Sequence, residues 1–349
     1  MNKSGTLKIE ATQHFQKPNR ILFVGATKNF FKIGFYTIHY LQKHHPEIKM
    51  RLAIPNIEDA IPSCRGAQVE LVKWNPEKPE TLNEVFKDCD ASLLVPPINN
   101  RINVSRKYIE MSIKYKLKFL INIGVQFKSD CQDNDGENVG PSLIQNDAAK
   151  VIHLLDKSGI KYCNLNLPMF LENLLYQVDD IYYNRTFGFP CSPNASFSYV
   201  SCEDLAEIVG EMFAYQQIID DTRWTANNQV KISEIQLILS QITNQPIKYN
   251  YLSDNEFIQS LMMDTGSASS YESANKILQI WKKIERGEDM QPNKLLQNLL
   301  GREPQSALTW IVEHRCCFNK HPDCKHPQPP RKQQNYQDNT QFLDFRHKL

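Results

Sequence analysis

The sequence predicts a doubly wound α/β fold: a parallel sheet with helices on both faces, a smaller C-terminal α/β lobe and an irregular tail. Short, almost wholly apolar runs alternate with longer amphipathic stretches over the first half of the chain. Parallel strands need such long crossovers, and strands buried on both faces are apolar throughout. The 349 residues, 41% hydrophobic and 23% charged, can also bury a substantial core without disulfide or metal staples.

The first half of the chain supplies the sheet and its covering helices. Residues 21–25 are apolar and end in a glycine, and the amphipathic stretch that follows indicates a strand, a turn and a helix. Pro79 stands at the start of a later helix and Gly159 follows the end of another, where these residue types are favoured. The expected strands are residues 21–25, 51–54, 69–72, 91–95, 119–123 and 162–167, and the expected helices are residues 33–41, 79–86, 103–115 and 142–157.

From residue 184 onward, short strands mixed with helices predict a smaller lobe beside the sheet. Ser201 and Ser253, each with an acid three residues on, have the capping-box pattern of a helix start. The amphipathic stretch 271–286 is expected to pack on its own lobe, with a partner protein as the alternative. The expected division is an N-terminal arm (1–20), a first domain (21–183), a lobe whose sheet edge interleaves with it (184–320) and an extended basic tail (321–349).

Composition and terminal pattern indicate the compartment. No apolar run approaches the ~20 residues of a membrane-spanning helix, so we expect no membrane insertion. The N-terminus lacks the charged start and apolar run of a secretory signal. Nine scattered cysteines, an odd number without repeated spacing, favour reduced thiols. These features predict a cytoplasmic protein, with a place in a large complex or on the cytoskeleton as an option and the mitochondrial matrix as a weaker alternative.

Charge is distributed unevenly along the chain. The formal net charge is +1, yet residues 1–20 carry a net +3 and residues 314–349 a net +4, so the body between them is acidic. Basic ends favour contact with an acidic surface, and we expect protein partners bound through these two segments. Solvated tails are the alternative. No recognised nucleic-acid motif accompanies the charge, so a nucleic-acid partner is not expected.

Several segments together resemble a known family, the NmrA-like group of atypical short-chain dehydrogenases. Each segment is weakly specific alone, but their order is the family's, and they span residues 20–318. The resemblance implies a Rossmann NAD(P)-binding fold with a small C-terminal lobe. The segments are ILFVGAT at 21–27 followed by Ile33-Gly34, PETL at 79–82, LVPP at 94–97, Ala149-Lys150, FLENL at 170–174, YVSCEDLA at 199–206, IKY at 247–249 and GREP at 301–304.

The cofactor site that the resemblance implies is altered in this chain. A dinucleotide turn needs glycines for close backbone approach to the pyrophosphate, whereas residues 28–32 form a lengthened loop with two phenylalanines that would fill the cleft. Pro55 and Asn56 stand where NADP-binding members carry an arginine. No cofactor is therefore confidently expected. If NAD(P) binding is retained, with Lys28 or Lys32 supplying positive charge, the candidate residues are Gly25, Thr27, Lys28, Lys32, Gly34, Asn56, Asn75, Val95, Pro96 and Lys150.

The catalytic relay implied by the wider dehydrogenase group is incomplete. That relay uses a tyrosine whose pKa is lowered by a lysine four residues on. Lys150 occupies the lysine position and is a weak catalytic candidate, but Asn146 replaces the tyrosine and the serine near Gly124 is missing. We therefore expect a pseudoenzyme that acts as a structural or regulatory binding subunit. The alternative is an NAD(P)H-dependent oxidoreductase or an NAD(P)H redox sensor.

Cysteine and histidine residues are dense near the C-terminus. Zinc needs about four such ligands within tetrahedral reach, and the spacing here matches no paired Cys-x-x-Cys pattern. The residues are therefore interpreted as core and surface side chains, and no metal is expected, with a metal site as the alternative. The cluster comprises His314, Cys316, Cys317, His321, Cys324 and His326.

Overall fold

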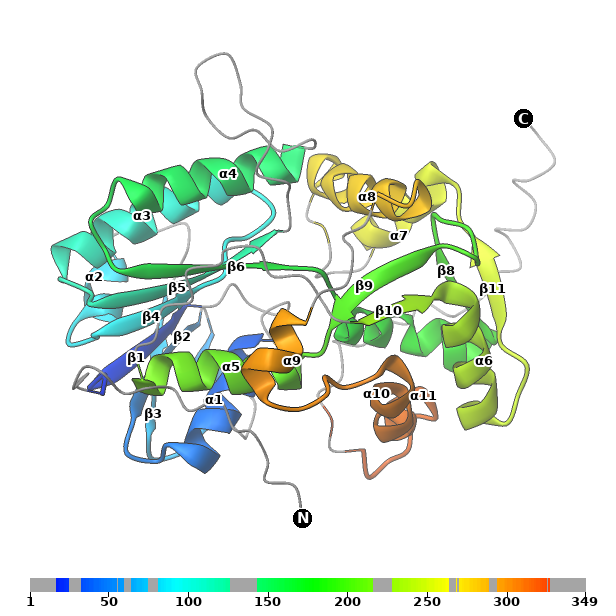
Figure 1. Cartoon of the computed structure of the whole chain (residues 1–349), viewed down its shortest axis with the longest axis horizontal. Helices are drawn as coiled ribbons and strands as arrows, with labels where there is room; N and C mark the ends of the chain where they lie inside the picture. Colours follow the sequence, from blue (N-terminus) through cyan, green and yellow to red (C-terminus); the bar gives the residue numbers. More distant parts are fainter. Residues whose placement is uncertain are drawn as a thin grey trace.

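A parallel sheet with helices on both faces forms one part of the protein, and a smaller α/β part lies beside it (Figure 1). The computed structural model describes residues 17–24, 33–54, 56–59, 64–74, 81–125, 143–215, 228–263, 268, 270–288, 294–324 and 326. Among these residues, no helix is long and apolar enough to cross a membrane.

The main sheet confirms the predicted fold class. Six parallel strands of the described chain are ordered β3-β2-β1-β4-β5-β6, so the strand order reverses between β1 and β4. The strands are β1 (Arg20–Val24), β2 (Lys49–Ile54), β3 (Val69–Lys73), β4 (Ala91–Leu94), β5 (Phe119–Val125) and β6 (Tyr162–Leu167). Their helices are α1 (Ile33–His44), α2 (Leu82–Phe86), α3 (Arg101–Lys114), α4 (Leu143–Asp156) and α5 (Cys202–Tyr215).

The two faces of the sheet bury different side chains. Helices α1 and α5 cover one face, and α2, α3 and α4 cover the other (Figure 1). Phe213 of α5 contacts both Phe23 of β1 and Phe119 of β5, with ring centroids 6.1 Å apart in each pair. Leu120 of β5 packs with α3 and α4 instead. Because side chains alternate along a strand, Asn122 and Gly124 share the face of Leu120.

The smaller part has its own core, which includes Trp281 and Trp310. Within the described residues it contains a three-stranded sheet, β10-β9-β7, and a two-stranded one, β11-β8. Helical turns over Leu171–Gln177 and Asp180–Asn184 precede β8. Its strands are β7 (Met169–Phe170), β8 (Thr186–Phe189), β9 (Ser196–Val200), β10 (Asn228–Lys231) and β11 (Lys248–Tyr251), and its helices are α6 (Ile232–Thr243), α7 (Asp254–Met263), α8 (Tyr271–Glu285), α10 (Ala307–Glu313) and α11 (Arg315–Phe318).

The chain passes between the two parts more often than the expected division at residue 184 allows. Residues 171–181 already belong to the core of the smaller part. Conversely, α5 and α9 (Leu295–Leu300) return to the main sheet, where Leu296 and Phe213 join the core on the α1 face. Helix α8 buries Trp281 in the smaller part, as expected of stretch 271–286. The boundary between the two parts therefore does not fall at a single position in the sequence.

Buried acids connect the segments that carry the family resemblance. Glu172 Oε1 accepts hydrogen bonds from Cys202 N (2.8 Å) and Trp310 Nε1 (3.3 Å). Asp204 accepts one from Gln305 N (2.7 Å) and forms an ion pair with Arg302 (2.8 Å). The motifs at 170–174, 199–206 and 301–304 thus meet at one junction between the two parts. The contacts of Glu172 and Asp204 join the three motifs there.

The capping boxes are formed to different extents. At α7, Ser253 Oγ accepts from Glu256 N (3.3 Å) and Glu256 Oε2 accepts from Ser253 N (2.9 Å), so both halves are present. At α5, Ser201 Oγ accepts from Asp204 N (3.2 Å), but the Asp204 carboxylate faces Arg302 instead. The tertiary ion pair therefore takes the place of the local cap.

The C-terminal segment stays folded beyond residue 320, where the tail is expected to begin. His321 N donates to Cys316 O (2.9 Å), and Cys324 N donates to His321 O (3.1 Å). Lys320 forms an ion pair with Asp179. Residues 321–324 are therefore a turn packed on α11 rather than part of an extended tail.

Candidate functional site

The candidate site is the edge of the main sheet where the parallel strands end. Strand β1 ends at Val24 between β2 and β4, which makes this the point where the strand order reverses. Doubly wound folds bind ligands in the crevice at such a point. The neighbouring strands β4 and β5 end beside it, at Leu94 and Val125. Residues just beyond these strands could contact a ligand bound at this edge.

Four of the expected cofactor residues lie at or near this edge. Gly34 is buried in the first turn of α1, directly after the segment that follows β1. Val95 and Pro96 follow β4 and are half-buried and buried. Asn56 is exposed beyond β2, and its Oδ1 accepts a hydrogen bond from Glu58 N (3.4 Å). These four residues therefore lie at the edge where the parallel strands have their carboxyl ends, which is where doubly wound folds bind ligands.

Other expected residues of the cofactor site lie outside the described part of the chain. They are Gly25, Thr27, Lys28 and Lys32 of the lengthened loop, its two phenylalanines, Pro55 and Asn75. The expectation that the loop fills the pyrophosphate cleft therefore stays a prediction.

The described positions of the catalytic relay lack the tyrosine that would transfer the proton. Asn146 lies half-buried in the first turn of α4, and its Oδ1 has no hydrogen-bond partner. Lys150 is one turn further along α4, with an exposed side chain. An asparagine amide neither gives nor takes a proton near neutral pH, and an exposed lysine would have no phenol to act on. The tyrosine–lysine pair is therefore absent as a working unit.

Three buried asparagines form a ladder across β5 and β6. Asn122 Nδ2 donates to Asn164 Oδ1 (2.5 Å), and Asn164 Nδ2 donates to Asn166 Oδ1 (2.9 Å). All three side chains are at most 3% exposed. Buried amides are costly unless they are hydrogen-bonded, so the ladder restricts each side chain to one orientation.

The ladder occupies the space beside Gly124. Gly124 pairs with Asn166 in the parallel register of β5 and β6. A Cβ atom at position 124 would lie 2.5 Å from Asn166 Oδ1 and 3.0 Å from Asn164 Oδ1. Both distances are shorter than an ordinary carbon–oxygen contact, so any side chain here would have to displace the ladder. The position where the relay's serine would stand is therefore closed to a side chain.

Further polar side chains lie on the α3 side of the sheet. Arg101 and Ser105 are buried one turn apart on α3. Arg101 Nε, Ser105 Oγ and Asn122 Oδ1 are buried atoms without a hydrogen-bond partner. Burial lowers the pKa of Arg101 to about 10 and the Asp147 carboxylate opposes this shift, so the guanidinium is charged at neutral pH. An unpartnered buried polar atom costs about 1–3 kcal/mol, which water or a ligand at this place would recover.

Helix α8 of the smaller part is attached to the start of α4. Lys276 Nζ lies 2.9 Å from Asp147 Oδ2 and 3.0 Å from Glu272 Oε1. Burial disfavours the charged form of Lys276, but its hydrogen bonds to these two carboxylates raise its pKa overall. Lys283 of α8 also donates to Gln145 of α4. The two parts are thus joined beside the relay positions.

The ladder and Arg101 were not among the expected site residues. The signal for the ladder is present in the sequence, because Asn164 and Asn166 alternate with apolar residues in one strand, and Asn122 interrupts another. Polar residues at every second position of a buried strand share one face. Their cross-strand pairing, however, depends on the register of β5 against β6. No comparable sequence signal marks Arg101.

No protein-family model and no curated protein sequence matches the chain. Among similar solved structures, the NADPH-dependent quinone oxidoreductase of Escherichia coli in complex with NADPH has a TM-score of 0.65 and 17% identity, covering 84% of this chain and 99% of its own. Triphenylmethane reductase of Citrobacter sp. complexed with NADP(H) has a TM-score of 0.64 and 16% identity, covering 85% and 99%. A nucleoside-diphosphate-sugar epimerase of Staphylococcus aureus has a TM-score of 0.63 and 19% identity, covering 84% and 99%. The chain therefore has the Rossmann fold that its resemblance to the NmrA-like group predicts.

Proposed function

We propose that this protein is a Rossmann-fold pseudoenzyme that acts as a structural or regulatory binding subunit. The observation that carries the proposal is the closed position at Gly124, where the Asn164 and Asn166 amides leave no room for a catalytic side chain. Asn146 replaces the tyrosine of the relay, and Lys150, which keeps the lysine position, is exposed and has no phenol to act on. Two of the three relay members are therefore lost, which is more than a single substitution would explain.

The ends of the chain are the proposed attachments to an acidic partner surface. Part of the charge near each end is used within the protein, because Lys17 pairs with Glu47, Arg20 with Glu70 and Lys320 with Asp179. The proposed contacts to the partner are the other basic residues of segments 1–20 and 314–349, which are Lys3, Lys8, Arg315, Lys325, Arg331, Lys332, Arg346 and Lys348.

The proposal is tested by a turnover assay and by a comparison of native size. The purified full-length protein is mixed with NADPH or NADH and a quinone acceptor, and cofactor oxidation is followed by absorbance. No turnover above the uncatalysed rate is expected. Robust turnover would refute the pseudoenzyme. In parallel, the native size of the protein in its source extract is compared with that of a chain lacking residues 327–349, which is expected to leave the larger assembly.

An NAD(P)H-dependent reductase or redox sensor is the second candidate. It is favoured by the fold match to reductases solved with NADPH or NADP(H) and by the unpartnered Arg101 Nε and Asn122 Oδ1, which a ligand could satisfy. Hydride transfer itself needs a bound nicotinamide rather than this relay. Calorimetric titration with NADPH and NADH separates the candidates. Micromolar binding without turnover supports a sensor, and no heat at millimolar cofactor supports a subunit that binds no dinucleotide.

A further inference from the structure

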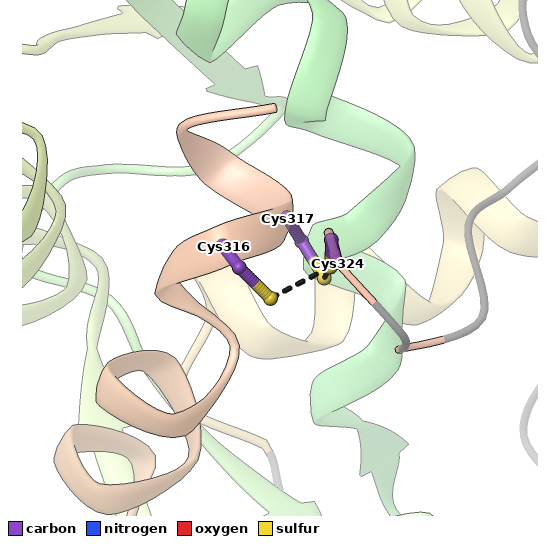
Figure 2. A group of neighbouring side chains, drawn as sticks. All are labelled: Cys316, Cys317 and Cys324. Atoms are coloured by element: carbon purple, nitrogen blue, oxygen red, sulfur yellow. Dashed lines mark hydrogen bonds between the residues drawn. The ribbon is translucent and has the colours of Figure 1, made fainter. Parts of the chain in front are cut away.

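Three cysteine side chains converge at the end of the smaller part. Cys316 and Cys317 lie on α11, and Cys324 follows in the turn after it (Figure 2). The three Sγ atoms all lie within 4.8 Å of one another. Cys324 Sγ is 2.6 Å from Cys316 Sγ and 3.4 Å from Cys317 Sγ. Cys324 thus lies beside both Cys316 and Cys317, although it follows them by eight and seven positions in the sequence.

The backbone positions Cys324 independently of the sulfur contacts. Lys320 has a φ of 46°, so the chain reverses directly after α11. His321 N then donates to Cys316 O, and Cys324 N donates to His321 O. The ion pair of Lys320 with Asp179 attaches the turn to the rest of the smaller part. The fold therefore brings the three thiols together before any ligand is considered.

The surroundings of the cluster are closed on one side and open on the other. Cys317 is fully buried in the core that includes Trp310 and Phe318. Cys316 and Cys324 are half-buried. A cation could therefore reach the sulfur atoms from solvent while the lobe limits how far they can move apart.

One of the two printed sulfur separations is close to what a thiolate-bound ion needs. Zinc binds thiolate sulfur at about 2.3 Å, and tetrahedral angles then separate the sulfur atoms by about 3.8 Å. The 3.4 Å between Cys317 and Cys324 is close to this value, and the shorter separation from Cys316 would have to open. Thiols, in contrast, are weak hydrogen-bond donors and gain little from contact with one another.

We propose that Cys316, Cys317 and Cys324 bind one zinc ion through three thiolate bonds, with a water molecule in the fourth position. The sequence interpretation, which expected no metal, relied on paired spacing. In the structure, the turn after α11 brings Cys324 to Cys316 and Cys317 without paired spacing. Bound zinc would tie α11 to the segment that leads into the C-terminal stretch, and so couple metal loading to the stability of the smaller part.

The test uses the reduced, metal-free, full-length protein. Zinc is titrated in competition with a chromophoric chelator, and cobalt is added separately to record thiolate-to-metal charge-transfer absorption. We expect one zinc per chain, cobalt bands characteristic of thiolate ligands, and a thermal midpoint that rises with zinc concentration. Cys324→Ala, which removes a half-buried ligand, is expected to abolish the bands and the shift. Cys64→Ala, a buried cysteine distant in sequence, is the matched control and should retain both.

Two results would overturn the proposal. One is zinc binding by the parent chain that does not exceed that of folded Cys324→Ala, with circular dichroism confirming that both are folded. The other is a reduced protein that binds no zinc but loses two hydrogens on mild peroxide treatment, with peptide mass spectrometry locating a Cys316–Cys324 disulfide. That outcome would make the cluster a redox pair instead.

Discussion

Gly124 of β5 lies opposite Asn166 of β6, and a Cβ atom on Gly124 would come within 2.5 Å of the Asn166 side-chain oxygen. This oxygen is fixed, because it accepts a hydrogen bond from Asn164, which in turn accepts one from Asn122. The strand end that would carry a catalytic serine therefore supports an amide ladder. The missing serine and the ladder are therefore connected, because the asparagine side chains occupy the space that a serine side chain at position 124 would need.

Introducing the missing serine should destabilise the protein. Gly124→Ser is expected to lower the free energy of unfolding by about 1–3 kcal/mol, the usual cost of adding atoms to a packed interior. Urea denaturation measures this loss. Gly66→Ser is the control: its added Cβ would also lie 2.5 Å from a side-chain atom, Gln42 Nε2, but that half-buried side chain can turn away. Equal losses in the two variants would show that the ladder is not rigid.

Removing the ladder partner should rescue the serine variant. In the Asn166→Ala background, Gly124→Ser is expected to cost less than it does alone, because the clashing oxygen is gone. The coupling energy from the four unfolding experiments should be about 0.5–3 kcal/mol, the range for residues in direct contact. Additive losses would mean that the two positions do not interact and would remove the main support for the proposed function.

Lys150 should be dispensable for stability and for cofactor binding. Its side chain is exposed on α4, and substitutions at such sites change stability by about 0.5 kcal/mol or less. Lys150→Met is therefore expected to match the parent chain in urea denaturation and in NADPH titration. A tenfold weaker affinity for NADPH in the variant would instead assign Lys150 to a ribose contact and favour the reductase.

The sequence predicted the sheet well because most strands are short runs rich in apolar residues that alternate with amphipathic helices. Such patterns depend on local periodicity alone, and β1, β4, β5 and β6 were found where expected. The ladder and the thiol cluster were harder to predict from the sequence. Asn122 meets Asn164 only through strand register, and Cys324 meets Cys316 only through the turn at Lys320. Both arise from contacts that no spacing rule describes.

Thiol labelling should separate the clustered cysteines from the buried ones. Burial raises the pKa of Cys64 to about 12 and that of Cys191 to about 11. A raised pKa leaves little of the thiolate that reacts, so both should resist iodoacetamide at about pH 8 in the native protein. Burial also raises the pKa of Cys316, but Cys316 and Cys324 are only half-buried and should be labelled first, as measured by peptide mass spectrometry. Complete labelling in urea is the control, and rapid native labelling of Cys64 would contradict its burial.

Asp204 should contribute more to stability than Glu207, although both contact the same arginine. Asp204 is 2% exposed, accepts a hydrogen bond from Gln305 N and pairs with Arg302 at 2.8 Å. Glu207 pairs with Arg302 at 2.6 Å but is half-buried.

The difference follows from what each substitution leaves behind. Asp204→Ala leaves the part-buried backbone N–H of Gln305 without its charged acceptor and removes a carboxylate that is itself buried, so a loss of about 2–3 kcal/mol in the free energy of unfolding is expected. Glu207→Ala removes only a solvent-screened ion pair, which is worth about 1 kcal/mol or less. Urea denaturation of the two variants measures both losses. If they were equal, the junction between the family motifs would depend on Arg302 alone, and Asp204 would act only as one of its two counter-charges.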